Sequence, residues 1–259
     1  MEGKKMEKSK LREIWLEEEK SVREKGCCFS QYAGRYDEER GLPWDMRETV
    51  KRYLEPGGRL LEVDAGGGEF LLSLGYPPVL ISATESDLPL AEECRNLLSP
   101  MGVDFQSYGQ GGKLPFGDGI FNVVINRHGC CDESEVARVL KKGGVFITEQ
   151  VGAENDKDMV KLLLPETKDV LSEERCLSGV RTRHEKAGLS VIEEKEAFRP
   201  LRFYDVGALV WFVRMAENEF PSFSVETHFD NLLKAQEVLE QQGFIESTAH
   251  RYFIVSQKS

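Results

Sequence analysis

Apolar and polar positions follow two alternating patterns along most of the chain. Short apolar runs bounded by Gly, Pro or charged residues indicate buried strands, and apolar residues spaced three or four apart indicate amphipathic helices. The expected strands cover 59–64, 79–85, 104–108, 121–125, 145–148, 189–197 and 250–256. The expected helices cover 45–54, 69 to about 75, 88–98, 130–140, 156–163, 172–187, 203–215 and 226–242. Strands that alternate with helices predict an α/β fold with a mostly parallel sheet.

The first 44 residues stand apart from this alternation. Residues 1–25 are rich in both charge signs and carry a narrow apolar stripe that includes Trp15, which predicts an amphipathic helix. Residues 26–45 have the composition of an irregular aromatic linker. We expect 1–44 to form a helical lid or edge segment. We expect 45–259 to form the main domain, with a helical insertion at about 200–225.

The chain is organised around residues 60–70, where an apolar run passes into Gly66, Gly67 and Gly68 and then into a helical pattern. Glycine allows positive φ and lets a ligand approach the backbone closely. The helix start behind it offers unpaired N–H groups. Such a turn binds the pyrophosphate of a dinucleotide or the amino-acid part and ribose of S-adenosylmethionine (SAM), or is a tight turn without a ligand. Asp64, at the place of a first glycine, repels a pyrophosphate and suits cationic SAM.

A second signal lies at the end of the next expected strand. Glu85 follows Gly66 by 19 residues (85 − 66). An acidic residue at this spacing and at a strand end accepts hydrogen bonds from ribose hydroxyls. The alternative is a surface glutamate at a strand end that binds no ligand. Because a side chain at a strand tip contributes little packing, we expect Glu85→Ala to leave the fold intact.

Three stretches then carry a resemblance to a known family. Residues 62–68 resemble motif I of class I SAM-dependent methyltransferases, (D/E)-x-G-x-G-x-G, with Asp64 replacing the first glycine. Residues 109–124 resemble the family pattern G-D-x-x-x-L-P-F-x-D-x-x-F-D-x-V, with Gln110 and Asn122 replacing acids. Residues 138–144 resemble its R-V-L-K-P-G-G turn. The resemblance covers about residues 45–152. It implies a Rossmann-like, doubly wound, seven-stranded and mostly parallel sheet with an antiparallel last strand.

The resemblance also implies a cofactor site for SAM. The methionine part would lie on Glu62, Asp64, Ala65, Gly66, Gly67 and Gly68. The ribose would lie on Glu85 and Ser86, and the adenine on Gln110 and Gly111. Asn126 and Arg127 would complete the site at the end of strand 121–125.

The sequence signals for catalytic and substrate-binding residues are less specific than those for the cofactor. His128 follows the same strand and is a candidate general base, or else a hydrogen-bonded structural histidine. Candidate substrate residues are Tyr32, Tyr36, Glu149 and Gln150; for the two tyrosines the alternative is ordinary packing.

The composition indicates which kinds of partner are disfavoured and in which cell compartment the protein is expected. The 259 residues carry a formal net charge of −11, which disfavours nucleic acid as a partner. No apolar run reaches the ~20 residues that span a bilayer, and the N-terminus lacks a signal-peptide core. Six cysteines without C-x-x-C spacing favour free thiols over a metal site. We therefore expect a cytoplasmic protein without a metal; its oligomeric state cannot be predicted.

These observations predict a SAM-dependent methyltransferase that acts on a small-molecule acceptor. An RNA or protein methyltransferase is an alternative, for which Arg181, Arg183, His184 and Lys186 form the one obvious basic cluster. A non-catalytic nucleotide-binding protein of the same fold is a third possibility, because Asp64, Gln110 and Asn122 depart from the family motifs.

Overall fold

The computed structural model describes residues 2–25, 32–39, 41–109, 111–167 and 175–259. They fall into two compact units. Unit 1 comprises 1–41, 154–171 and 198–250, and unit 2 comprises 42–153, 172–197 and 251–259. The N-terminal segment thus shares a unit with two later stretches of the chain. A lid function for residues 1–44 stays a prediction.

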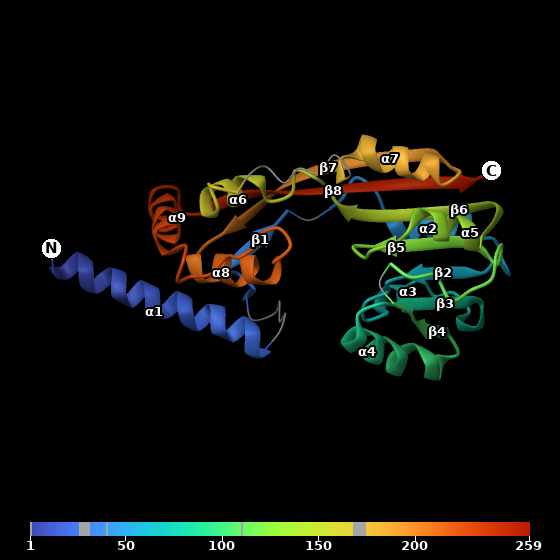
Figure 1. Cartoon of the computed structure of the whole chain (residues 1–259), viewed down its shortest axis with the longest axis horizontal. Helices are drawn as coiled ribbons and strands as arrows, with labels where there is room; N and C mark the ends of the chain where they lie inside the picture. The colour runs from blue at the N-terminus through green and yellow to red at the C-terminus, as the bar shows by residue number, and fades with distance from the viewer. Residues whose placement is uncertain (1, 26–31, 40, 110, 168–174) are drawn as a thin grey trace. The chain divides into compact units, whose positions relative to one another are not determined.

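The described strands form one sheet in the order β1-β7-β8-β6-β5-β2-β3-β4. They are β1 Tyr36–Glu38, β2 Leu60–Val63, β3 Ile81–Glu85, β4 Asp104–Ser107, β5 Phe121–Arg127, β6 Leu140–Val151, β7 Leu189–Phe203 and β8 Ile245–Lys258. Neighbours from β6 through β5, β2 and β3 to β4 are parallel, whereas β8 is antiparallel to β6 (Figure 1). The predicted fold class is confirmed. The short β1, which pairs antiparallel with β7, adds a strand that the pattern did not predict.

Nine described α-helices accompany these strands. They are α1 Glu2–Lys25, α2 Met46–Tyr53, α3 Glu69–Ser73, α4 Leu88–Leu98, α5 Glu133–Val139, α6 Lys157–Leu163, α7 Leu177–Lys186, α8 Val206–Met215 and α9 Phe229–Gln242. Helix α5 begins later than predicted because Asp132 is its N-cap, and the carboxylate accepts from the backbone N–H groups of Ser134 and Glu135. None of the helices described here is long and apolar enough to cross a membrane.

Unit 2 has helices on both faces of its sheet. Leu60, Val123 and Ile125 belong to a buried cluster with residues of α2, α3 and α4. Leu61 and Val124, their neighbours along the strands, belong to a second cluster with residues of α5. Because successive side chains of a strand point to opposite faces, this division defines a doubly wound arrangement.

Several strand boundaries differ from the predicted ones. Strand β7 extends to Phe203 and β8 begins at Ile245, beyond the apolar runs that marked them. Much of β7 is only partly buried, so polar residues interrupt its apolar pattern. The predicted turn at 141–144 lies inside β6, which starts at Leu140 and is irregular opposite Phe121.

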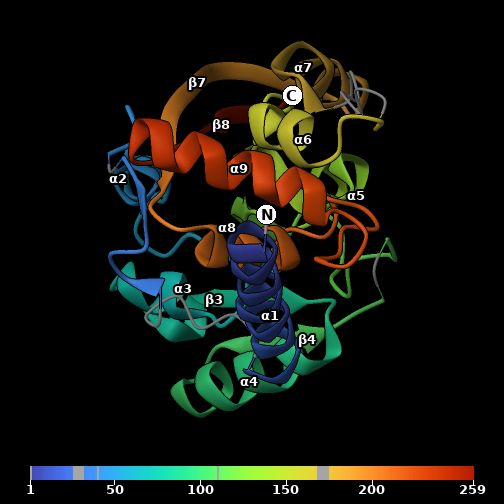
Figure 2. The same ribbon diagram turned by 90° about the vertical axis from the view of Figure 1, so that its left-hand side faces the viewer.

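Unit 1 has its own core. Helix α1, as predicted, is amphipathic and buries Trp15 in a cluster that includes Trp211 of α8 and Leu232 of α9. Figure 2 shows the ribbons of these three helices. Outside this core, the Arg35 guanidinium donates to the carboxylate of Glu18 on α1 at 2.7 Å and to that of Asp205, the N-cap of α8, at 2.6 and 2.8 Å. Charge-assisted bonds therefore connect α1 to the start of α8.

The packing of α3 gives a test of the unit 2 core. Leu71 is fully buried beneath the helix that follows the glycine turn. We expect Leu71→Ala to lower the free energy of unfolding by about 2–5 kcal/mol, because it leaves a cavity among close-packed side chains. Urea unfolding measures this loss. A loss below about 1 kcal/mol would contradict the described packing.

Candidate functional site

The glycine turn after β2 owes its shape to positive φ angles. Asp64 has φ +50°, Gly66 +57° and Gly68 +85°. Aspartate is one of the few non-glycine residues that tolerate this region, so Asp64 can replace the first glycine of the motif. A Cβ on Gly66 would meet nothing within 4 Å, whereas one on Gly68 would lie 2.9 Å from Leu98. Gly68 thus allows packing on α4, and Gly66 lies beside open space.

Backbone contacts fix the middle of the turn. The Ala65 N–H donates to the carbonyl of Thr84 at 2.9 Å, which joins the turn to β3. A Cβ on Gly67 would lie 2.5 Å from the Glu69 carboxylate. The turn is therefore hydrogen-bonded to β3 at Ala65 and closely approached by the Glu69 carboxylate at Gly67.

Glu85 is buried at the end of β3, with 4% of its surface exposed. One carboxylate oxygen accepts from the Gly66 N–H at 2.8 Å, and the other accepts from Ser86 at 2.8 Å and Asp87 at 2.9 Å. A carboxylate accepts about four hydrogen bonds, so three positions are filled by backbone. That Glu85→Ala leaves the fold intact stays a prediction, and these three bonds add the expectation that the variant loses stability.

Asp64 joins the turn to two loops. Its carboxylate accepts from the Tyr108 hydroxyl and from the Cys130 N–H, both at 3.1 Å. Burial, and then the nearby Glu85 carboxylate, raise the pKa of Asp64 despite these donors. A Cβ on Gly129 would lie 2.5 Å from that of Asp64, so the loop after β5 packs directly on the turn.

The buried Glu62 and the half-buried Arg127 form a polar pair at the carboxyl ends of β2 and β5. Glu62 Oε1 lies 3.9 Å from Arg127 Nε, and the side chain of Glu62 is 2% exposed. Glu62 Oε2 and Arg127 Nε are buried atoms without a hydrogen-bond partner in the part of the chain described. Burial raises the pKa of Glu62 to about 8, although Arg127 lowers it. This pair retains an acceptor and a donor for a ligand.

Asn126 and Gln150 hold the scaffold of the site. Asn126 is fully buried, and its amide donates to the carbonyl of Val63 at 2.8 Å and accepts from Gln150. The same Gln150 nitrogen lies 3.2 Å from the carbonyl of Gly129. These bonds give the Asn126 and Gln150 amides a structural role, and the predicted contacts of Asn126 with the cofactor and of Gln150 with the substrate stay predictions.

His128, Glu149 and Trp44 form a chain of polar contacts beside this scaffold. His128 has φ +56°, and its Nε2 lies 3.5 Å from Glu149 Oε1. The other carboxylate oxygen accepts from Trp44 Nε1 at 2.6 Å. Burial alone would raise the pKa of Glu149, but hydrogen bonds from His128 and Trp44 outweigh it and lower that pKa. Glu149 is therefore an anion oriented from two sides.

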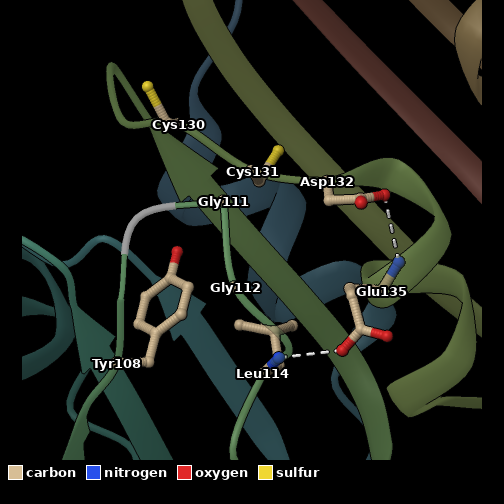
Figure 3. Close-up of a pocket in the computed structure, with 8 residues that line it drawn as sticks. All are labelled: Tyr108, Gly111, Gly112, Leu114, Cys130, Cys131, Asp132 and Glu135. Carbon is tan, nitrogen blue, oxygen red and sulfur yellow. Dashed lines mark hydrogen bonds between the residues drawn. The ribbon is translucent and has the colours of Figure 1, made fainter.

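A pocket of about 270 Å³ opens beside the turn (Figure 3). It is lined by Tyr108, Gly111, Gly112, Leu114, Cys130, Cys131, Asp132 and Glu135. Gly111 was predicted here, and Gln110 lies outside the described residues. The Leu114 N–H donates to Glu135 at 2.8 Å, which fixes the L-P-F segment that pointed to this loop. Tyr108, Cys130 and Cys131 were not predicted to line the site, because no motif or spacing in the sequence identifies them as site residues.

The two candidate substrate tyrosines lie in unit 1. Tyr32 is 4% exposed, stacks on Trp211 with ring centroids 4.0 Å apart, and donates its hydroxyl to Glu18 at 2.8 Å. Tyr36 stacks on Phe203. Both rings therefore contribute to the packing of unit 1. No cluster of three or more potential metal ligands occurs among the residues with described positions.

Comparisons with known proteins address the fold. No family model and no curated protein matches the chain. A crystal structure from Bacillus halodurans, named as a candidate methyltransferase, superposes with a TM-score of 0.57 at 18% identity, covering 82% of this chain and 98% of that one. The YcgJ protein of Bacillus subtilis superposes with a TM-score of 0.54 at 18% identity, covering 82% of this chain and 96% of that one. A protein of unknown function from Deinococcus radiodurans superposes with a TM-score of 0.55 at 14% identity, covering 89% of this chain and 99% of that one. The chain has the class I SAM-dependent methyltransferase fold, as the sequence predicted.

Glu62 makes stability depend on pH in a defined window. Its pKa is about 8 in the folded protein against 4.5 for an exposed carboxyl, so between these values the folded state holds a proton that the unfolded chain has released. Stability from this group therefore falls as pH rises from about 4.5 to 8. We expect Glu62→Gln to gain stability relative to the parent over this window, by at most about 1.4 kcal/mol per pH unit.

Urea unfolding of the parent, Glu62→Gln and Glu92→Gln at pH 5, 6.5 and 8 measures this effect. Glu92 is an exposed residue of α4 and should show no such trend. A constant difference between Glu62→Gln and the parent across the three pH values would show that Glu62 does not carry the proton.

Glu85 gives the second test of the site. Glu85→Ala leaves the N–H groups of Gly66, Ser86 and Asp87 without their carboxylate acceptor. Hydrogen bonds to charged groups contribute about 1.5–3 kcal/mol each, so we expect a loss of at least about 2 kcal/mol in the free energy of unfolding. Glu92→Ala is the matched control. Equal unfolding midpoints for the two variants would refute the structural role of Glu85.

Proposed function

We propose that the protein is a SAM-dependent methyltransferase that acts on a small-molecule acceptor. The observation that carries the proposal is the buried Glu62 beside the half-buried Arg127, next to a glycine turn with open space at Gly66. Glu62 Oε2 and Arg127 Nε have no hydrogen-bond partner among the described residues. Ligands of open α/β sheets bind at the carboxyl ends of the strands, where these residues lie.

The Glu62–Arg127 pair suits a zwitterion. The ammonium of an α-amino acid would lie on Glu62 Oε2, and its carboxylate would lie toward Arg127. Asp64 and Glu85 make the turn acidic, which favours a cation over a pyrophosphate. SAM carries both the zwitterion and a sulfonium, whereas NAD carries neither.

The neighbouring pocket suits the adenine. Tyr108 and Leu114 supply an aromatic ring and an apolar wall, and the backbone of Gly111 and Gly112 supplies polar groups. The remaining acceptor position of the Glu85 carboxylate and the Ser86 backbone would meet the ribose. In this arrangement SAM supplies the electrophilic methyl group, while the chain supplies binding, orientation and exclusion of water.

The net charge and the pairing of the basic residues favour a small molecule as the methyl acceptor. The basic cluster expected to serve an RNA substrate is largely neutralised: Arg181 pairs with Glu194, and Arg183 Nε lies 2.8 Å from Glu133 Oε1. His184 is 1% exposed. With a net charge of −11, a small molecule is the favoured acceptor, and we propose a cytoplasmic location for the reaction.

The proposal predicts that SAM and its demethylated product bind and that NAD does not. Gly66→Val places a branched side chain in the open space and in a strained conformation, at a cost of about 1–3 kcal/mol. We expect this variant to lose SAM affinity at least about tenfold, beyond what its melting shift explains. Isothermal titration calorimetry and thermal unfolding measure the two effects.

Leu71→Ala is the control, since it removes packing beneath the turn and leaves the ligand-facing surface intact. It should lose stability and retain SAM affinity. Micromolar binding of NAD without binding of SAM would overturn the proposed function. Parent-like SAM binding by Gly66→Val would show that the cofactor does not lie on this turn.

A further inference from the structure

We propose that Glu149 is a positioning residue that holds His128 as the proton acceptor for the substrate, and that the methyl acceptor is therefore an atom that carries a proton, as in a hydroxyl, an amine or a thiol. This inference rests on the proposed function and adds the acceptor chemistry to it. It starts from the chain of contacts Trp44–Glu149–His128 at the carboxyl ends of β5 and β6.

Glu149 is anchored more firmly than a substrate contact needs to be. Its side chain is 10% exposed, and the indole of Trp44 donates to Oε2 at 2.6 Å. The indole itself stacks on the fully buried Phe253, with ring centroids 5.5 Å apart. The carboxylate therefore presents Oε1 in a fixed direction, and His128 Nε2 lies 3.5 Å from it.

The backbone also places the imidazole. His128 has φ +56°, an uncommon conformation for a residue other than glycine, and its N–H donates to the Glu149 carbonyl at 3.0 Å. Such strain persists where the surroundings impose it, and it is concentrated at functional sites. Asp64 is the other non-glycine residue of unit 2 with positive φ among the described residues, and it belongs to the cofactor turn.

This geometry selects one tautomer. A carboxylate accepts hydrogen bonds, so the nitrogen that faces Glu149 carries the proton and Nδ1 keeps its lone pair. Among the described residues, none donates to or accepts from Nδ1. The His128 side chain is 43% exposed, so Nδ1 can reach a substrate. Glu149 is the charged group in contact with the imidazole among the described residues, and Arg127 acts on Glu149 in turn.

A base at this place has a defined use. When a methyl sulfonium is bound, an acceptor electron pair forms the bond to the methyl carbon, and the pair of the broken carbon–sulfur bond stays on sulfur. An O–H or amine N–H acceptor must then release one proton. Nδ1 of His128 takes that proton, Glu149 stabilises the imidazolium, and water later removes the proton.

The tautomer can be measured without a substrate by nitrogen-15 NMR of the imidazole rings. We expect the parent to hold the His128 proton on Nε2 with at least about tenfold preference, as a charge-assisted bond allows. Glu149→Ala should give averaged signals from both tautomers. The rings of His184 and His228 are internal controls and should not change. His128→Asn assigns the signals.

Trp44→Phe is the second variant, because it removes the indole donor and keeps an aromatic ring beside Phe253. It should shift the His128 signals in the same direction, by less. A parent spectrum with the proton on Nδ1 or divided between both nitrogens would overturn the inference. So would an unchanged His128 signal in either variant with the fold retained.

Calorimetry with SAM on the same samples separates this inference from the proposed function. SAM binding with an unaltered tautomer in the variants rejects the role of Glu149 alone. A parent that fails to bind SAM rejects the proposed function, and the proton-transfer role falls with it. Incubation of metabolite extracts with methyl-labelled SAM should give products methylated on an atom that carried a proton. Label only on atoms without one, such as a tertiary amine or a thioether, would contradict the acceptor class.

Discussion

The site depends on one buried carboxylate. Glu85 accepts three backbone N–H groups, one of them from Gly66, and thereby joins the glycine turn after β2 to the end of β3. Without this link the N–H groups of Gly66, Ser86 and Asp87 would lose the acceptor that orients them. The shape of the turn, and with it the space beside Gly66, follows from an interaction within the protein. In this account Glu85 builds the site as well as facing the ribose.

Around this link the protein concentrates charge and strain. The buried Glu62 and the half-buried Arg127 each keep one buried polar atom without a hydrogen-bond partner among the described residues, and burial raises the pKa of Glu62 to about 8. Asp64 and His128 adopt positive φ. Each of these features costs stability, and unit 2 compensates for them with close-packed apolar clusters on both faces of its sheet. Unpaired buried groups and strained residues gathered at one end of a sheet are typical of a binding site.

The alternation of apolar strands and helices was sufficient to predict the fold class, because burial on both sheet faces leaves a strong pattern. The glycine turn and the spacing to Glu85 located the candidate site. Partners across the fold could not be predicted: Tyr108 with Asp64, Trp44 with Glu149, and the Asn126 amide all join residues distant in the chain. Nor could the pattern show that residues 1–41 share a unit with 198–250, since three separate segments build that core.

A crystal structure of the protein with the demethylated product of SAM tests the central claim most directly. The account predicts that the amino-acid end lies between Glu62 and Arg127, that the backbone of Gly66 contacts the ligand, and that the adenine lies in the pocket beside Tyr108 and Leu114. Nδ1 of His128 should face the side of the sulfur from which the methyl group has left. A ligand bound elsewhere, with the Glu62–Arg127 pair still unpaired, would contradict the account.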